Sequence, residues 1–571
     1  MPRFSKLRVE AGFLLQAEVC GRVFKSEGPI RTAGNEESVR PLLRSAATAL
    51  GLALLIALRL GAEEPEGPAL RIGRITIRAV NVFSPQETTS RLYRAMNRAH
   101  VPTHPSVIRK FLLFKEGDPF VPGKLEETEK NLRELGFLKS ASVTASAPHG
   151  GVVDVLVVTQ DSWSLLPGVP IASAGGQTTY GFQLLERNLF GTGRELSLSY
   201  NKEIQRITRI VEYVDPYLLG SYWSGRFSQG WNSDGERTRA EVIHPFSSLS
   251  SAQSHGLRLD VFGQTTRTYT DGDVGAAYHQ DHRGVSLEAG WALATSRTRA
   301  HRLTAGVEVL EDRFEALPER PSDLLPDPRT FRIVFVGYEL AESDLMKLNY
   351  VNRDLRVEDF NLGWGLTARF GVAPEFLGSA GNTAFVRLKA GKGARLGERG
   401  FVLASVSYET RLSGGPKNEV VSASLDVVQK LRTRHLQTLV AKLRYDQGWN
   451  LDRDVQFIAD GLVGLRGYRL FSFAGDKRMI LNLEQRLFLG KEMLKLFSPG
   501  VVFFVDTGAA APEGTPLRPS DFKTDLGMGL RMSISRAPTS NVYRIDFAYA
   551  LNRDPKGRRG LIVSFSASQG F

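Results

Sequence analysis

A glycine-rich loop that carries one arginine is the part of this sequence that most suggests specific chemistry. Arg466 is followed directly by Gly467 and Tyr468, and glycine lets a backbone turn sharply and approach a wall closely. A guanidinium shielded from water needs a carboxylate, which its planar fork binds through paired hydrogen bonds. The next two strand-like segments each carry one acid, Glu484 and Asp506. The pattern indicates a structural ion pair, with a plain solvated surface loop as the alternative.

Catalytic and metal-binding motifs are missing from the sequence. It contains no G-x-S-x-G elbow, no H-E-x-x-H pair and no P-loop. The 9 histidines show no metal-binding spacing. His100 and His104 lie four positions apart, but Pro102 between them argues against a shared helical face, so we expect loop or capping residues. We predict that the protein is not an enzyme and binds no cofactor and no metal.

Composition and charge narrow the choice of partners. The chain has 571 residues, 42% hydrophobic and 23% charged, and a net charge of +12. Because the basic residues are spread along the chain without a block of like charges, we predict no nucleic-acid binding. The charge fits a polar interior or contact with acidic lipid head groups. The only cysteine is Cys20, so no intrachain disulfide forms.

The N-terminal region predicts export. Residues 39–62 have arginines at the start, an apolar run from Ala46 to Leu58, and the small residues Gly61 and Ala62 before two glutamates, which is the pattern of a signal peptide. The run is too short to span a bilayer comfortably. We interpret residues 1–38 as a mis-assigned start or an unstructured prefix.

Residues 71–160 predict a small domain of the order β-α-α-β-β. Strand-like alternation at 71–80 is followed by two amphipathic helical segments, at 104–114 and 124–136. Two further strands, 137–146 and 151–161, flank a turn. Two helices on a three-stranded sheet can bury one core. The stretch after the first strand has the character of an insertion or an extra helix.

Residues 164–571 predict a transmembrane β-barrel. Helical periodicity nearly vanishes and short alternating segments recur, as in 402–411, 439–446 and 543–549. One face of these segments carries repeated charges, and the other is apolar with Tyr and Phe near the ends, which fits a lipid-facing exterior around a polar lumen. A soluble β-sandwich is the alternative. At roughly 25 residues per strand and connection, the region accommodates about 16 strands.

The last strand fixes an expected topology. Segment 561–571 alternates, carries Phe565 and ends in Phe571, which is typical of an outer-membrane assembly signal. An even number of strands puts both barrel ends in the periplasm, so connection 447–476 starts on the extracellular side. A loop folded from there into the lumen would bring Arg466 to the inward side chains of the next strands, which are Asn482, Glu484, Arg486 and Asp506.

Several motifs together resemble one family. They are LRGY (465–468), LNLEQR (481–486), FFVDTG (503–508), DLGMGLR (525–531), LLERNLFGTG (184–193) and YVDPYLLG (213–220). Their order resembles the barrel of the BamA/TamA outer-membrane assembly and translocation superfamily. FKEGDPF (114–120) and ELGFL (134–138) place residues 71–160 close to the POTRA domain of that family.

The resemblance implies a mainly β fold with one periplasmic POTRA domain and a 16-stranded barrel. It also implies an inward-folded loop locked by Arg466, Gly467 and Tyr468 against Asp506 and Glu484. Dedicated assembly factors have several POTRA domains and two-partner secretion translocators have two, whereas this chain has one. We therefore expect an outer-membrane protein of a Gram-negative bacterium that inserts or translocates proteins. Its expected partners are unfolded outer-membrane or secreted clients, outer-membrane lipids and accessory lipoproteins. A passive channel for small solutes is the alternative.

Overall fold

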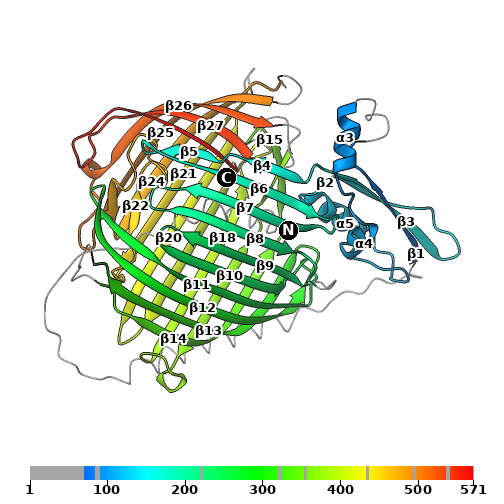
Figure 1. Ribbon diagram of the computed structural model, residues 1–571, viewed down its shortest axis with the longest axis horizontal. Coiled ribbons are helices and arrows are strands. Elements are labelled where there is room, and N and C mark those ends of the chain that lie inside the picture. The colour runs from blue at the N-terminus through cyan, green and yellow to red at the C-terminus, as the bar shows by residue number, and fades with distance from the viewer. Residues whose placement is uncertain are drawn as a thin grey trace.

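A three-stranded sheet with helices lies beside a large closed β-barrel in the computed structural model (Figure 1). The structure describes residues 70–83, 91–218, 223–318, 325–352, 357–432, 436–491, 493, 497–534 and 541–569. The predicted prefix and signal peptide, and Phe571 of the predicted assembly signal, lie outside these residues. No described helix is long and apolar enough to cross a membrane.

The N-terminal domain has the predicted order, with one helix added. Its elements are β1 (Arg71–Val80), α3 (Arg91–Ala99), α4 (Pro105–Lys110), α5 (Pro122–Glu134), β2 (Leu138–Ala145) and β3 (Val152–Asp161). The sheet order is β1-β3-β2, with β1 parallel and β2 antiparallel to β3. Helix α3 lies in the stretch that the sequence marked as an insertion or an extra helix.

One hydrophobic core holds this domain together. Val155 and Val157 of β3 are both buried. They lie two positions apart and so point to the same face of the sheet, because successive side chains of a strand point to opposite faces. Ile108 of α4 and Leu132 of α5 cover them, and both have an exposed fraction of 0%. The two helices therefore lie on one face of the sheet. The outer strands β1 and β2 each pair with β3 on one side only within the described sheet.

The barrel is formed by antiparallel strands from Leu165 onward. They are β4 (Leu165–Gly168), β5 (Ile171–Ala174), β6 (Gln177–Leu189), β7 (Arg194–Lys202), β8 (Ile207–Asp215), β9 (Ser224–Asn232), β10 (Gly235–His244), β11 (Gln253–Thr270), β12 (Asp273–Thr295), β13 (Arg299–Ala316), β14 (Arg329–Glu342), β17 (Gly365–Ala373), β18 (Thr383–Arg395), β19 (Gly400–Leu412), β20 (Pro416–Lys430), β21 (Leu436–Trp449), β24 (Lys477–Phe488), β25 (Phe497–Ala511), β26 (Lys523–Ile534), β27 (Asn541–Ala550) and β28 (Leu561–Gln569). Two short hairpins stand outside the barrel order, β15 (Leu345–Asn349) with β16 (Val357–Asn361), and β22 (Phe457–Ala459) with β23 (Phe473–Gly475).

The predicted number of 16 strands is wrong. Within the described residues the closed barrel has 20 strands, when β4 and β5 are taken as one interrupted strand because both pair with β6. The error came from the assumed length of the connections. Only Ser233 and Asp234 separate β9 from β10, and only Asp271 and Gly272 separate β11 from β12, so more strands fit into the same chain.

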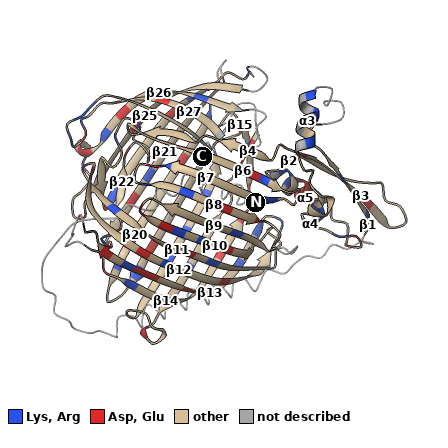
Figure 2. Ribbon diagram, in the orientation of Figure 1, with Lys and Arg blue, Asp and Glu red and all other residues tan. Residues whose placement is uncertain are grey.

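The barrel has an apolar outside and a charged inside, as the alternating segments predicted. Leu287 and Leu530, for example, are 55% and 47% exposed on the outer surface. Ion pairs between side chains of different strands, such as Arg237 of β10 with Asp260 of β11 and Arg369 of β17 with Glu308 of β13, line the interior. Figure 2 shows charged residues distributed along the barrel strands. An apolar exterior around a polar lumen is the arrangement of a membrane barrel.

We expect the purified protein to resist unfolding in SDS until it is heated. A closed barrel satisfies its backbone hydrogen bonds internally and presents no free strand edge to the detergent. Unheated samples should therefore migrate as a compact band on a gel, and boiled samples as an unfolded one. Circular dichroism of the unheated sample should show mainly β-structure. Identical migration of the two samples would contradict the closed barrel.

The joint between domain and barrel is a buried polar cluster. Asp161 accepts a hydrogen bond from the backbone N–H of Thr103 at 2.8 Å, and Asn188 of β6 donates to the Thr103 hydroxyl at 2.9 Å. His100 is buried beside them, with Nδ1 3.0 Å from Asn81 Oδ1, and burial lowers the pKa of its imidazole. His100, directly after α3, and His104, directly before α4, both lie outside the helices, as expected, and His100 is in addition part of the buried joint.

Candidate functional site in the barrel lumen

The long connection between β21 and β24, residues 450–476, lies against the inner wall of the barrel. Its β22–β23 hairpin encloses a compact turn in which Leu465 and Tyr468 are fully buried. These side chains form a cluster with Ile480 of β24 and Ala550 of β27. The apolar character of the loop is explained by this packing, because the loop covers wall residues that would otherwise face water.

Asp460 organises the turn from inside. One carboxylate oxygen accepts hydrogen bonds from the backbone N–H groups of Leu462 and Val463, at 2.9 and 3.1 Å, and the other accepts from Phe471 at 2.8 Å. Burial raises the pKa of the Asp460 carboxyl, and these backbone donors act against that shift. The turn is therefore a folded unit that can present the Arg466 side chain in one direction.

Arg466 is engaged on its edge and on its face. Its Nε and Nη2 donate to the two carboxylate oxygens of Asp506 at 2.7 and 2.8 Å, and its Nη1 donates to Glu484 at 2.8 Å. The guanidinium carbon lies 3.5 Å from the ring centroid of Phe504, and Nη1 lies 3.8 Å from Asp546. Only 13% of the Arg466 side chain is exposed, and Asp506 is fully buried. Burial alone would lower the pKa of Arg466, but the bonded Asp506 and the neighbouring acids raise it above its usual value.

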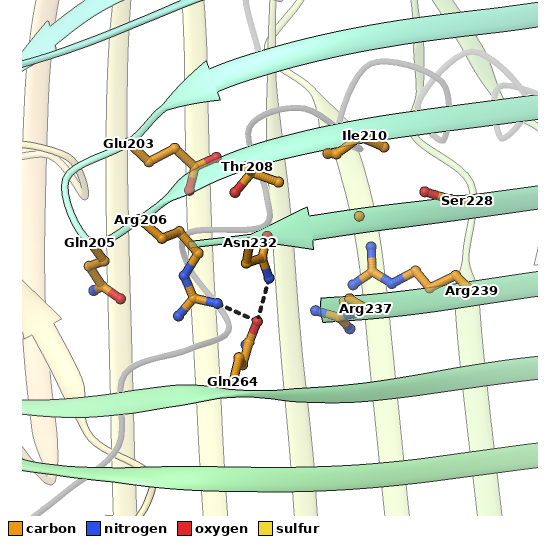
Figure 3. Close-up of a pocket in the computed structure, with 11 residues that line it drawn as sticks. Glu203, Gln205, Arg206, Thr208, Ile210, Ser228, Asn232, Arg237, Arg239 and Gln264 are labelled. Carbon is orange, nitrogen blue, oxygen red and sulfur yellow. Dashed lines mark hydrogen bonds between the residues drawn. The ribbon is translucent and has the colours of Figure 1, made fainter. Parts of the chain in front are cut away.

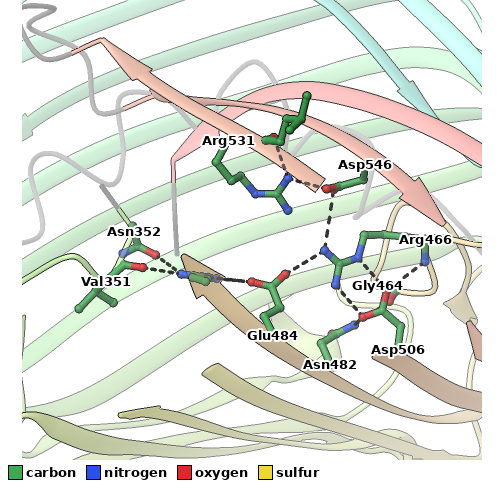
Figure 4. A network of polar contacts seen from close by, with 11 residues as sticks. Val351, Asn352, Gly464, Arg466, Asn482, Glu484, Asp506, Arg531 and Asp546 are labelled. Carbon is green, nitrogen blue, oxygen red and sulfur yellow. Dashed lines mark hydrogen bonds and ion pairs between the residues drawn. The ribbon is translucent and has the colours of Figure 1, made fainter. Parts of the chain in front are cut away.

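Asn482 joins the loop backbone to the same carboxylate. Its side-chain amide donates to Asp506 Oδ1 at 2.7 Å and to the carbonyl of Gly464 at 2.6 Å. Figure 4 shows Arg466, Asp506, Asn482 and Gly464 converging in this way. The register pairs Asn482 with Asp506 across β24 and β25, which explains why the two side chains share one face of the wall.

Gly467 and Tyr468 make the closest approach of the loop to the barrel wall. A Cβ atom added at Gly467 would lie 2.5 Å from the Cβ of Asp525 on β26, so a larger residue cannot occupy this place without displacement. The Tyr468 hydroxyl donates to the carbonyl of Thr524 at 2.9 Å. The structure thus brings all five sequence-predicted loop-site residues to one region: Arg466, Gly467, Tyr468, Glu484 and Asp506.

We expect Gly467→Ala to loosen the loop without unfolding the barrel. The added methyl group meets the wall at a fixed backbone position, so the turn must move. Trypsin cleavage after Arg469 should therefore become faster in the folded, SDS-resistant protein. Gly560→Ala is the matched control, because a Cβ at Gly560 meets nothing within 4 Å. Equal cleavage rates in both variants and the wild type would show that the close approach has no role.

A second set of contacts anchors the loop to other strands, and sequence reasoning missed it. Asp452 pairs with Arg411 of β19 and Arg329 of β14, each at 2.8 Å, and Asp454 pairs with Arg329 at 2.6 Å. Phe471 stacks on Tyr269 of β11 with ring centroids 3.7 Å apart. The loop therefore reaches across the lumen, from the β24–β25 wall to β11, β14 and β19.

The terminal strand β28 contains Phe565, the described residue of the predicted assembly signal. Phe565 of β28 lies opposite Ser173 of β5, where the last strand closes the barrel on the first. Sequence reasoning also missed Asp546 and Asp525, which border the Arg466 site from β27 and β26. In the described ranges, no group of three or more His, Cys, Asp or Glu side chains could hold a metal ion.

A comparison with protein families identifies the N-terminal domain. Residues 100–159 match the POTRA family model, described as a surface antigen variable number repeat. No curated protein matches the chain. The match supports a POTRA domain before the barrel, which the sequence motifs had also indicated.

Solved structures of several barrel proteins are similar in fold. CdiB from Acinetobacter baumannii has 12% identity and a TM-score of 0.45, covering 88% of this chain and 74% of that chain. BamA from Haemophilus ducreyi, in a form lacking POTRA domains 1–3, has 13% identity and a TM-score of 0.39, covering 86% and 85%. The FrpB iron transporter from Neisseria meningitidis has 8% identity and a TM-score of 0.39, covering 76% and 87%. At such identities and scores, these likenesses carry no argument about function.

Proposed function

We propose that this chain is a single-POTRA protein of the BamA/TamA superfamily that inserts proteins into, or translocates them across, the outer membrane of a Gram-negative bacterium. In this proposal the POTRA domain lies in the periplasm, and loop 450–476 enters the lumen from the extracellular side. The observation that carries the proposal is the three-hydrogen-bond engagement of Arg466 by Asp506 and Glu484. A buried arginine held in this way keeps a long loop inside the lumen until it is released.

The POTRA sheet offers a place for unfolded clients. In its order β1-β3-β2, strands β1 and β2 are the edges, each paired on one side within the described sheet. An extended client segment can add a strand to such an edge through main-chain hydrogen bonds. The polar joint around Asp161 holds this sheet at a fixed place beside the first barrel strands, so a captured segment would be presented to the barrel.

The barrel seam supports insertion into the membrane. Within the described residues, strands β28 and β5 share a single register pair, Phe565 with Ser173, whereas β28 pairs with β27 along the whole stretch from Asn541 to Tyr549. Fewer ladder hydrogen bonds mean a lower cost of separation. The seam between the first and last strands is therefore where the barrel would open toward lipid for a client strand.

A passive channel for small polar solutes is the second candidate, and one feature favours it. A polar pocket lies between strands β8 and β11, lined by residues that include Arg206, Asn232, Arg237, Arg239 and Gln264 (Figure 3). Arginines and amides on an inner wall can bind and pass small anionic or polar solutes. This candidate gives no role to the POTRA domain.

Depletion of the protein followed by proteomics of the outer membrane separates these functions. A broad loss of barrel proteins is expected for an insertase, and loss of one secreted protein is expected for a dedicated translocator. Either result would support the proposal. An unchanged proteome together with reduced uptake of small solutes would favour the channel and contradict the proposal.

A further inference from the structure

A second segment enters the lumen, from the opposite end of the barrel. The connection between β14 and β17 folds into the β15–β16 hairpin, which starts at the barrel end that faces the POTRA domain. Met346, Leu348 and Val351 of this connection are buried in one cluster with wall residues of three strands, Phe401 of β19, Val428 of β20 and Val440 of β21. Val440 lies opposite Glu484 in the register and so marks the lumenal face.

The residues that directly follow β15, 350–352, are bound to the wall by polar contacts. Arg486 of β24 donates from Nη1 to the carbonyl of Val351 and to the side-chain oxygen of Asn352, both at 2.9 Å. Thr438 of β21 donates to the carbonyl of Tyr350 at 2.6 Å. Because Arg486 binds both the backbone of Val351 and the side chain of Asn352, the orientation of its guanidinium decides whether these residues stay on the wall.

One carboxylate connects the hairpin to loop 450–476. Glu484 accepts from Arg466 of the loop on Oε1 at 2.8 Å, and it accepts from Arg486 on Oε2, with Nη2 at 2.7 Å. All three side chains are largely buried, with exposed fractions of 11–13%. Figure 4 shows the chain of contacts running from Asp506 through Arg466 and Glu484 to Val351 and Asn352.

We propose that the described residues of this connection, 343–352 and 357–364, form a second plug of the lumen, and that Glu484 couples its release to the release of loop 450–476. Arg466 fixes the carboxylate of Glu484, which in turn fixes the guanidinium of Arg486 on the hairpin. When Arg466 leaves, Glu484 loses the partner that orients it, and the hold of Arg486 on the hairpin weakens. Linkage requires the reverse effect as well, so release of the hairpin loosens the loop. The inference rests on the proposed role of Arg466 in holding the loop.

The test uses a buried thiol as a reporter of the hairpin. Val351→Cys is introduced into a chain with Cys20→Ser, and its rate of labelling by a small maleimide is measured in the folded, SDS-resistant protein. Val351 is fully buried, so the thiol reacts only when the hairpin opens. We expect Arg466→Ala and Glu484→Gln each to accelerate labelling roughly tenfold, the effect of losing one charge-assisted hydrogen bond.

Arg478→Ala is the matched control. Arg478 lies on the same strand β24 and holds the same loop, through the carbonyl of Ile458 at 2.7 Å, but its carboxylate partner is Asp446 at 2.6 Å and not Glu484. It should leave the labelling rate of Val351→Cys near that of the parent. Equal acceleration by Arg478→Ala and Arg466→Ala would overturn the coupling, because any loosening of the loop would then suffice.

A second reporter separates the coupling from the loop itself. Leu465→Cys places a thiol at a fully buried position of loop 450–476. If Arg466→Ala exposes position 465 and leaves position 351 protected, Arg466 does hold the loop, as proposed, but the coupling to the hairpin is wrong. If Arg466→Ala exposes neither position, the proposed role of Arg466 fails, and the coupling fails with it. Exposure of both positions is the expected result.

Discussion

Arg466→Ala should abolish the proposed insertion or translocation activity while the barrel still reaches the membrane. The loop is joined to β21 and β24 at its two ends, so one lost contact does not prevent strand closure. The substitution leaves Asp506 buried without the arginine that neutralises it, and unpairing a buried charge costs roughly 3–5 kcal/mol. That energy is sufficient to release the loop from its place. The measurement is client insertion into vesicles that contain the purified variant.

Two further variants make this result specific. Arg466→Lys should restore the activity only in part, because an ammonium group cannot form the bidentate fork with Asp506. Arg453→Ala removes the same charge from the same loop at an exposed position, where the guanidinium contacts only the carbonyl of Leu325 among the contacts described. Arg453→Ala should behave like the wild type. Full activity of Arg466→Ala would show that the contact of Arg466 with Asp506 and Glu484 is not required for the proposed activity.

A disulfide across the seam should stop insertion and leave the fold intact. Ser173→Cys and Phe565→Cys lie directly opposite each other in antiparallel strands, where Cα atoms are about 4.5–5.5 Å apart and a disulfide can form. The bond fixes the strands whose separation the proposed mechanism requires. We expect insertion to fall to background under oxidising conditions and to return with a reductant.

The control disulfide joins strands that should never separate. Ile545→Cys with Phe565→Cys links β27 to β28 at a register pair inside a continuous ladder. Both double variants would be made with Cys20→Ser. If the seam disulfide and this control both leave insertion unchanged, lateral opening is not part of the mechanism. Unchanged conductance of the oxidised seam variant, with insertion lost, would separate the insertase from a passive channel.

The sequence could predict the acidic side of the Arg466 site because the contacts are local to neighbouring strands. Glu484 and Asp506 each stand on a clearly alternating segment, and alternation alone decides that they face the lumen. The contact of Asp452 with Arg329 was beyond reach, since it depends on which strands face each other across the lumen. That arrangement follows from strand number and tilt, and the number was wrong because the short turns could not be distinguished from longer connections.

The joint between the two domains shows a similar limit. Pro102 correctly excluded a helical pair of histidines, but the burial of His100 depends on how the POTRA domain contacts β6. Hydrophobic periodicity describes one element at a time. It therefore predicted α5 closely, but it extended the preceding helix to residue 114 although α4 ends at Lys110. It carried no information about the polar cluster that forms between two domains.

The inward course of loop 450–476 has a consequence for how the cell surface would appear to other molecules. In the proposed topology, several connections on the extracellular side are tight turns, among them 175–176, 233–234, 271–272 and 413–415. The longest connection of the described barrel on that side is folded into the lumen instead of projecting outward. An antibody, a bacteriophage or a digestive protease would meet the ends of β11 and β12 and the shorter connections, but not loop 450–476. The fold that fills the lumen would thus withhold the longest connection of that side from molecules outside.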